Sequence, residues 1–150
     1  MTNFLVIGAT GYIALHVIDQ LLKSGYFVRG IVRNVKDKKQ IEPLINLASK
    51  YLIGKLEITE ADLLDPSSWK EVVMNIDIII HFCSPFPIEK FERPIVLFEP
   101  TVIGTLNVLN AALNTTVKRV VINSCFTTIS GVEPETQGNI FDEMDWIDVI

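Results

Sequence analysis

Short apolar runs alternate with longer amphipathic segments along most of this chain. The apolar runs are typical of buried strands, and we predict strands at residues 3–8, 27–33, 55–62, 76–83 and 119–125. The segments between them carry apolar residues at helical spacing, which predicts helices over residues 13–24, 37–51, 64–73 and 99–114. Strands separated by helices of this length form βαβ units. The pattern therefore predicts an α/β fold built on a doubly wound parallel sheet.

Glycine, proline and aspartate stand near the ends of the predicted helices. Gly25 is expected to end the first helix, and Pro43 is expected near the start of the second. Asp65 is a favourable N-cap residue, and Pro66 then takes the first helical position. These residues support the helix boundaries that the hydrophobic spacing predicts.

Composition agrees with a sheet that is covered on both faces. Hydrophobic residues make up 49% of the 150 residues, and the mean hydropathy is +0.35. No apolar run is long enough to span a bilayer, and the chain enters its first strand without a signal peptide, so we expect a cytoplasmic protein. The net charge of -5 argues against nucleic-acid or membrane partners. Two cysteines are too few for a disulfide scaffold, and we predict no metal site.

The length suits one domain, which we place at residues 1–150. The last stretch, VEPETQGNIFDEMDWIDVI, is acidic and has no clear hydrophobic period. It ends without a closing helix or strand. We therefore expect an incomplete nucleotide-binding domain whose substrate-binding lobe lies outside this sequence.

The segment VIGATGYIA joins the first predicted strand to the first helix. Gly8 ends the strand and Gly11 opens the helix, which permits a tight turn and a close approach by a ligand. The amide groups at the start of the helix and the helix dipole favour an anion at this point. Ala14 is small enough to let the helix pack close to the strand. This G-x-x-G-x-x-A spacing on a strand–helix turn predicts a dinucleotide pyrophosphate site.

The end of the second predicted strand indicates which dinucleotide binds. An acidic residue there would accept hydrogen bonds from the adenosine ribose and select NAD. This chain instead has IVRN, with Arg33 near that place and Lys36, Lys38 and Lys39 following. A guanidinium can hold a phosphate through two hydrogen bonds. We therefore predict NADP, or NADPH in its reduced form, as the cofactor.

Several segments together resemble one enzyme family. They are VIGATGYIA, GYFVRGIVRN, EADLLDPSSW, IIHFCSPF, EPTVIGTLNVLNAA, VKRVVINSC and FDEMDW. In this order they are similar to the extended short-chain dehydrogenase/reductase superfamily, also known as the NAD-dependent epimerase/dehydratase superfamily. The nearest match within it is the dihydroflavonol reductase-like branch of carbonyl reductases. The resemblance implies a Rossmann-type fold and covers nearly the whole chain.

The resemblance implies a role for particular positions in cofactor binding. The pyrophosphate would lie along Gly8, Thr10, Gly11, Tyr12 and Ile13. Arg33 would bind the 2′-phosphate, with Lys39 or its neighbour Gln40 near a second basic position. Asp62 and Leu63 would flank the adenine. The ribose and nicotinamide would lie beside Phe82, Cys83, Ser84, Asn123 and Ser124.

The catalytic residues that the resemblance implies are only partly present. The family uses a tyrosine as proton donor, a lysine four residues later, and a serine or threonine that binds the substrate oxygen. Tyr51 and Lys55 have this spacing, but they precede the third predicted strand and Gly54 separates them, so we reject the pair. The genuine pair is expected beyond Ile150. Cys125 takes the family serine position, and Ser124 stands just before it.

Cys83 and Cys125 both follow the carboxyl ends of strands that we expect to be neighbours. They are predicted to be small residues that fill space, with an oxidisable thiol pair as the alternative.

The leading hypothesis for function is an NADP-dependent reductase of a small carbonyl substrate. A catalytically silent dinucleotide sensor or scaffold is the alternative if the protein ends at Ile150. A relative of sugar-nucleotide epimerases or 3β-hydroxysteroid dehydrogenases is a second enzyme interpretation. The sequence leaves the oligomeric state open.

Overall fold

One sheet of five parallel strands forms the centre of the molecule, in the order β3-β2-β1-β4-β5. The computed structural model describes residues 2–82, 99–130, 140–142 and 144–146. The strands are β1 (Asn3–Ile7), β2 (Phe27–Val32), β3 (Lys55–Glu60), β4 (Ile78–His81) and β5 (Arg119–Ile122). This order confirms the doubly wound Rossmann-type sheet that the sequence predicts, with the predicted fourth and fifth strands as neighbours.

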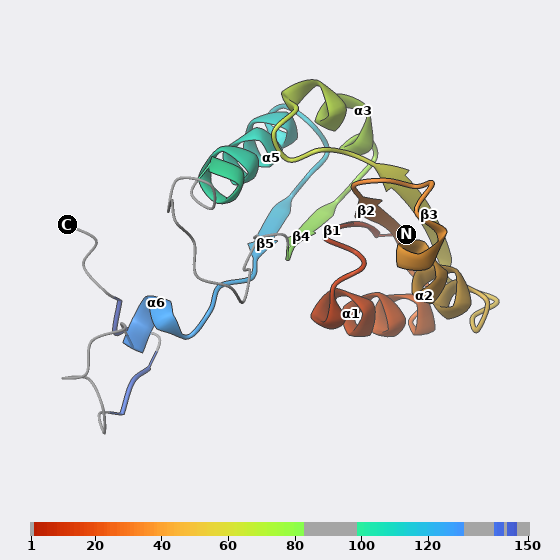
Figure 1. Cartoon of the computed structure of the whole chain (residues 1–150), viewed down its shortest axis with the longest axis horizontal. Coiled ribbons are helices and arrows are strands. Elements are labelled where there is room, and N and C mark those ends of the chain that lie inside the picture. The colour runs from red at the N-terminus through yellow and green to blue at the C-terminus, as the bar shows by residue number, and fades with distance from the viewer. Residues whose placement is uncertain (1, 83–98, 131–139, 143, 147–150) are drawn as a thin grey trace.

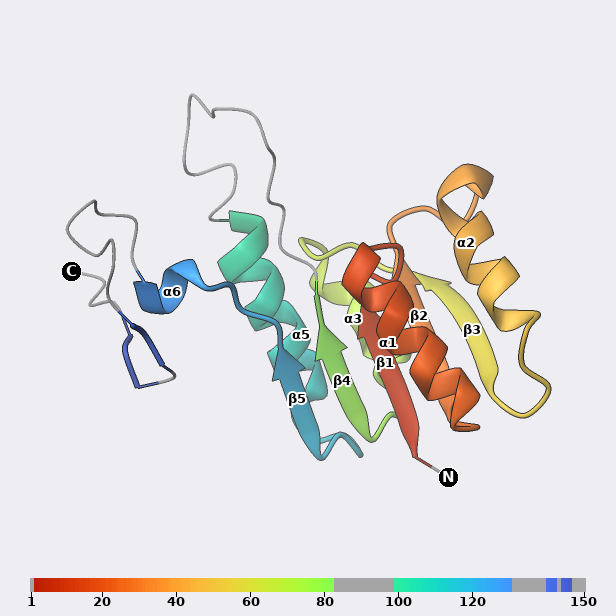
Figure 2. The ribbon, with the colours of Figure 1, turned by 90° about the horizontal axis from the view of Figure 1, so that it is seen from below.

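Helices lie on both faces of the sheet. The helical elements are α1 (Tyr12–Lys23), α2 (Lys38–Ala48), η1 (Pro66–Ser68), α3 (Trp69–Val72), η2 (Glu99–Ile103), α5 (Gly104–Ala112) and α6 (Thr127–Ser130). Figure 1 shows α1 and α2 on one side of the sheet and α3 and α5 on the other. In Figure 2, β5 lies at the sheet edge nearest the C-terminal segment.

Each face of the sheet has its own apolar core. On the first face, Ile18 and Leu22 of α1 and Leu44 of α2 are almost completely buried against the sheet. On the second face, Trp69 of α3 and Val108 of α5 are buried in the same way. The strands are apolar on both sides for this reason, which explains the high mean hydropathy.

The ends of the helices follow the sequence rules in two cases and depart from them in one. Gly25 has φ +81° just after the end of α1, a conformation that glycine adopts without strain. The Asp65 side chain accepts a hydrogen bond from Ser67 N, so it caps the η1 turn that leads into α3. The expected place of Pro43 is wrong, because this proline lies inside α2. The N-terminus of α2 is instead capped by Asp37, which accepts from Gln40 N.

Two predicted boundaries also differ from the structure. The strand expected over residues 119–125 ends at Ile122, because its last paired residue lies opposite His81 of β4. Asn123, Ser124 and Cys125 therefore follow the strand instead of forming its end. The helix expected over residues 99–114 begins with the π-type turn η2 and continues as α5 to Ala112.

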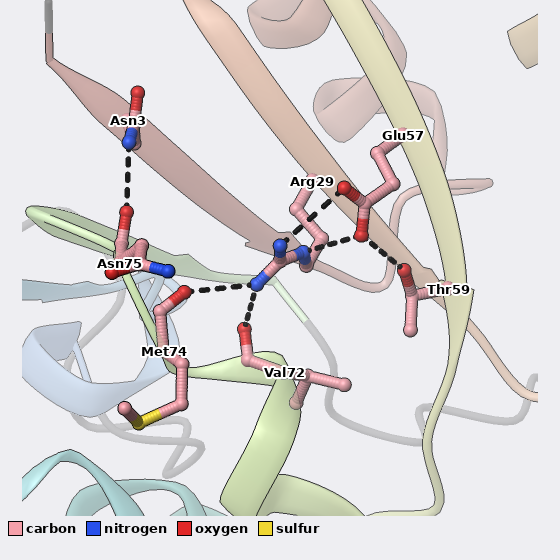
Figure 3. Close-up of polar contacts among 7 residues, drawn as sticks. All are labelled: Asn3, Arg29, Glu57, Thr59, Val72, Met74 and Asn75. Atoms are coloured by element: carbon pink, nitrogen blue, oxygen red, sulfur yellow. Dashed lines mark hydrogen bonds and ion pairs between the residues drawn. The ribbon is translucent and has the colours of Figure 1, made fainter.

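Arg29 of β2 connects its own strand to β3 and to the end of α3 (Figure 3). Its guanidinium donates to the Glu57 carboxylate of β3, with Nε 2.7 Å from Oε1, and to the carbonyl groups of Val72 and Met74 at the end of α3. Thr59 Oγ1 also donates to Glu57 Oε1 at 3.0 Å. This arrangement satisfies carbonyl groups that a helix end leaves without partners. It fixes the end of α3 against β2 and β3.

No helix among the residues that the structure describes is long and apolar enough to cross a membrane.

Candidate functional site

The turn between β1 and α1 has the tight backbone that its glycines predict. Gly8 has φ +78°, in the left-handed region that favours glycine. Gly11 N donates to Gly8 O at 2.9 Å and closes the turn. A Cβ atom at Gly11 would lie 3.2 Å from Gly8 O, closer than most side chains approach. Both glycines are therefore required by the shape of the turn.

The same turn is attached to β2 through Ala9. Its amide donates to Ile31 O at 3.1 Å, and its side chain is completely buried. Ala9 packs against Gly30 of β2, where an added Cβ would lie 3.1 Å from Ala9 Cβ. Gly30 thus makes room for the turn, a role that the sequence analysis did not assign to it.

The N-terminus of α1 is open for an anion. Gly11 is its N-cap, and among the described residues no side chain caps it by accepting a hydrogen bond. The amide groups of the first turn therefore lack helix partners and favour a negatively charged group. Tyr12 and Ile13 are 79% and 53% exposed at this end, and Thr10 is half-buried beside them. Ala14 is completely buried, which confirms that it brings the helix close to the sheet.

Basic residues follow the carboxyl end of β2. Arg33 is exposed, and it forms no hydrogen bond or ion pair with other residues in the described part of the chain. Lys36 and Lys39 are exposed on the loop and on the first turn of α2. The guanidinium of Arg33 is thus available for an external anion.

Asp62 and Leu63, which follow β3, place their side chains differently. Asp62 is exposed, and its Oδ1 accepts from Leu64 N at 2.9 Å. Its backbone oxygen accepts from Trp69 Nε1 at 2.9 Å, which fixes Asp62 to the core. Leu63 instead packs against Gly104 at the start of α5. Of these two side chains, that of Asp62 is the more exposed, and the contact of Leu63 with an adenine stays a prediction.

His81 is the last residue of β4 and is only 3% exposed. Its Nε2 lies 3.1 Å from Thr105 Oγ1, and that hydroxyl donates its own proton to Thr101 O at 2.6 Å. His81 Nε2 must therefore carry the proton and donate to Thr105. Nδ1 is then a buried acceptor, with no partner among the residues described. Burial lowers the pKa of His81, so the ring is neutral near pH 7.

The residue after β4 lies beside the end of β1, where the glycine turn begins, and the residue after β5 lies beside the end of β4. Phe82 N donates to Ile7 O at 3.1 Å, and Asn123 N donates to His81 O at 2.9 Å. Phe82 is half-buried against the α1 face, whereas Asn123 is exposed. Cys83 and Ser84, predicted beside the nicotinamide, lie outside the described residues. The space-filling prediction for Cys83 and Cys125 and its thiol-pair alternative therefore stay untested.

Ser124 and Cys125 line an open hollow of about 490 Å³. Thr128 Oγ1 donates to Cys125 O at 2.7 Å, so Ser124 Oγ must be the donor in its 3.1 Å contact with Thr128 Oγ1. The other lining residues are mostly apolar and include Phe126, Ile129 and Trp146. Thr128 was not predicted from the sequence, although its hydroxyl bonds to both predicted catalytic residues, Ser124 and Cys125.

The rejected pair, Tyr51 and Lys55, lies at the amino ends of the strands, whereas the glycine turn lies at their carboxyl ends. Lys55 begins β3, beside Phe27 at the start of β2. Tyr51 Oη donates to Asp19 Oδ1 on α1 at 2.7 Å, and this hydrogen bond raises the pKa of Tyr51. The pair is therefore remote from the glycine turn and structural in character.

The described candidate residues all follow the carboxyl ends of parallel strands. In open α/β sheets this edge binds ligands, at the point where the strand order reverses. Here the reversal lies between β1 and β4. The sequence pattern of the family described as "NAD dependent epimerase/dehydratase family" matches residues 4–145. This chain belongs to that family. The glycine turn and the uncapped start of α1 fit the dinucleotide that the family name implies.

Two characterised members of the epimerase/dehydratase family show what this chain is similar to. It is 38% identical over 149 residues to cinnamoyl-CoA reductase 1 of Petunia hybrida, covering 95% of this chain and 41% of the relative. It is 33% identical over 145 residues to dihydroflavonol 4-reductase of Arabidopsis thaliana, covering 96% of this chain and 37% of the relative. The chain thus spans about two fifths of the length of these relatives.

This chain is also similar to a solved structure of Gre2 from Candida albicans in complex with NADPH. The two chains are 33% identical with a TM-score of 0.67, and the match covers 87% of this chain and 39% of the other. The shared fold agrees with the glycine turn and strand order described above.

Proposed function

We propose that the protein is an NADP-dependent oxidoreductase that reduces the carbonyl group of an aldehyde or ketone, similar to dihydroflavonol reductase. The observation that carries the cofactor choice is Arg33, which stands exposed and unpaired among the described residues at the end of β2. An acidic residue there would favour NAD, whereas a guanidinium favours a 2′-phosphate. The NADPH-bound Gre2 structure supports the same cofactor choice, and the names of the reductase relatives support a reduction reaction.

The residues of this chain divide the binding of the cofactor among them. The amide groups at the start of α1 would hold the pyrophosphate, because Gly11 leaves them without a side-chain cap. Arg33 would bind the 2′-phosphate, with Lys39 as a second basic group. Asp62 offers Oδ2 to the adenine amino group while Oδ1 holds Leu64 N. When bound, NADPH supplies the hydride for reduction.

The substrate is proposed to enter the hollow beside β5. Its apolar lining suits the carbon skeleton of an aldehyde or ketone. Ser124 can turn its hydroxyl from Thr128 to the carbonyl oxygen, and a hydroxyl is a stronger hydrogen-bond donor than the thiol of Cys125. We therefore assign substrate polarisation to Ser124 and place Cys125 beside it. The proton donor is expected from a tyrosine–lysine pair outside these 150 residues.

The first test is a titration of the protein with NADPH and with NADH, followed by cofactor fluorescence. Arg33→Ala should weaken NADPH binding about 10-fold or more, because it removes a charge-assisted pair of hydrogen bonds. NADH has no 2′-phosphate, so its affinity should change less than about 2-fold. Arg119→Ala is the matched control. Arg119 is also exposed, but it is the first residue of β5 and so lies at the amino ends of the strands. Equal affinity of the unaltered protein for both cofactors would contradict the NADP assignment.

The second arm of the test concerns the reaction itself. The full natural protein is mixed with NADPH and a panel of aldehydes and ketones, and loss of the reduced cofactor is followed by absorbance. We expect turnover with at least one carbonyl class. Tight NADPH binding without any turnover would favour a catalytically silent nucleotide binder.

A further inference from the structure

The loop between β2 and α2 carries Arg33 and has two internal hydrogen bonds. Asn34 Oδ1 accepts from Lys36 N at 2.8 Å, and Asn34 O accepts from Asp37 N at 3.3 Å. Both bonds join residues of the loop to one another or to the cap of α2. They define how the loop bends, but they do not fix its position relative to the sheet.

Glu60 supplies the missing connection to the sheet. It is the last residue of β3 and lies opposite Val32, the residue just before Arg33. Its Oε2 accepts a hydrogen bond from Val35 N at 3.0 Å. Within the described part of the chain, no other side chain outside the loop and α2 bonds to residues 33–36. Glu60 therefore ties the loop to the end of β3.

Because it accepts from Val35 N, the Glu60 carboxylate is not paired with Arg33. The ion pairs among the described residues join Arg29 to Glu57 and Lys118 to Asp77, and neither includes Glu60 or Arg33. A carboxylate paired with Arg33 would compete with a phosphate for the same guanidinium. By accepting from a backbone amide, Glu60 holds the loop and leaves Arg33 available.

We propose that Glu60 is a positioning residue for cofactor selectivity, because its hydrogen bond to Val35 N fixes the loop from which Arg33 binds the 2′-phosphate. This inference rests on the proposed function. Glu60 need not touch the cofactor, since its effect passes through the backbone between Arg33 and Val35. The role predicts that the acceptor atom matters more than the negative charge.

Two substitutions separate the acceptor from the charge in the full natural protein. Glu60→Gln removes the charge but keeps a side-chain oxygen that can accept from Val35 N. Glu60→Ala removes both. Glu42→Ala is the matched control, because Glu42 is an exposed glutamate on the adjacent helix α2 whose side chain forms no hydrogen bond with another described residue. NADPH and NADH affinities are measured for each variant by fluorescence titration.

We expect Glu60→Ala to weaken NADPH binding about 3- to 10-fold and to change NADH binding less than about 2-fold. Glu60→Gln and Glu42→Ala should keep NADPH affinity within about 2-fold of the unaltered protein. If Glu60→Ala binds both cofactors unchanged, or if Glu60→Ala and Glu60→Gln weaken NADPH binding equally, the proposal is overturned.

Amide hydrogen exchange at Val35 without cofactor gives a readout that does not depend on NADP. Exchange should be faster in Glu60→Ala than in the unaltered protein or in Glu60→Gln. Equal exchange in all three proteins would overturn the tether even where NADPH remains preferred. Slow exchange at Val35 in a protein that does not prefer NADPH would instead overturn the NADP assignment and the selectivity role together.

Discussion

Single residues decide the shape of the glycine turn. Gly8 at φ +78° and Gly25 at φ +81° have nearly the same backbone conformation, but they stand at opposite ends of α1. Gly8 borders the open helix N-terminus, and Gly25 follows the helix C-terminus. The two positions therefore allow backbone strain to be separated from an effect on the site.

Gly8→Ala should destabilise the fold by about 1–2 kcal/mol, because an L side chain is strained in the left-handed region. Gly25→Ala should cost a similar amount, with an added contact to the flexible Ile53 side chain. Only Gly8→Ala should also weaken NADPH binding, by about 10-fold or more, since a shifted turn misplaces the amides of α1. Urea denaturation and cofactor titration measure the two effects. Equal loss of cofactor binding in both variants would show that strain alone, at either position, is responsible.

The sequence predicts those candidate site residues whose chemistry is visible in a local pattern. Gly8, Gly11 and Ala14 follow from the spacing on a strand–helix turn, and Arg33 follows from its place after the second strand. Glu60 did not, because its role depends on which strand lies beside β2. A local pattern does not state strand order, so contacts between strand ends escape it.

At the scale of elements, Arg29 links β2, β3 and the end of α3 (Figure 3). The hydrogen bond from Arg29 is the main reason that the pKa of Glu57 lies below its ordinary value of 4.5. A carboxyl group with a lowered pKa in the folded state stabilises the fold above its unfolded pKa. This stabilisation is lost as the pH falls through the folded-state pKa.

Glu57→Gln should lower the free energy of unfolding at pH 7 by less than about 1 kcal/mol, because Glu57 is partly exposed and the pair is screened by solvent. The difference from the unaltered protein should shrink as the pH falls from about 4.5 through the lowered pKa of the folded state, below which the Glu57 carboxyl is protonated. Urea denaturation at several pH values measures this difference, with Glu42→Gln as the control. A difference that stays constant down to acid pH would exclude the ion pair as its source.

Most elements could be predicted because their hydrophobic patterns are unambiguous. β1 and β4, at the centre of the sheet, lie between two helix layers and have nearly continuous apolar runs, and α1 and α5 keep a regular apolar spacing. Pro43 was misplaced because the sequence did not show that Asp37 caps α2 several residues earlier. The end of β5 was placed too late because the predicted strand included Asn123, Ser124 and Cys125, which follow the last residue paired with β4.

At the scale of the whole molecule, stability is expected to be greatest at the centre of the sheet. β1 pairs with β2 and β4, and its residues Leu5, Val6 and Ile7 are almost completely buried. β3 pairs with β2 at one edge of the described sheet, and several of its residues are exposed. Opening at this edge breaks fewer contacts than opening at β1.

Hydrogen exchange of the native protein should therefore be slowest at the amides of Leu5–Ile7 and faster in β3. The β1 amides should exchange only through global unfolding, so their opening free energy should match that from urea denaturation. Those of β3 should exchange through smaller openings. Equal protection in the two strands would indicate that the sheet opens as one cooperative unit.

The reversal of strand order between β1 and β4 also separates two kinds of specificity. The groups proposed for the adenosine half all lie before β4 in the chain, whereas Ser124 and Cys125 follow β5. The proposed function thus places cofactor preference and carbonyl preference in different stretches of the gene. Exchanging residues 33–63 between relatives should therefore change the preference between NADPH and NADH without altering the substrate pocket.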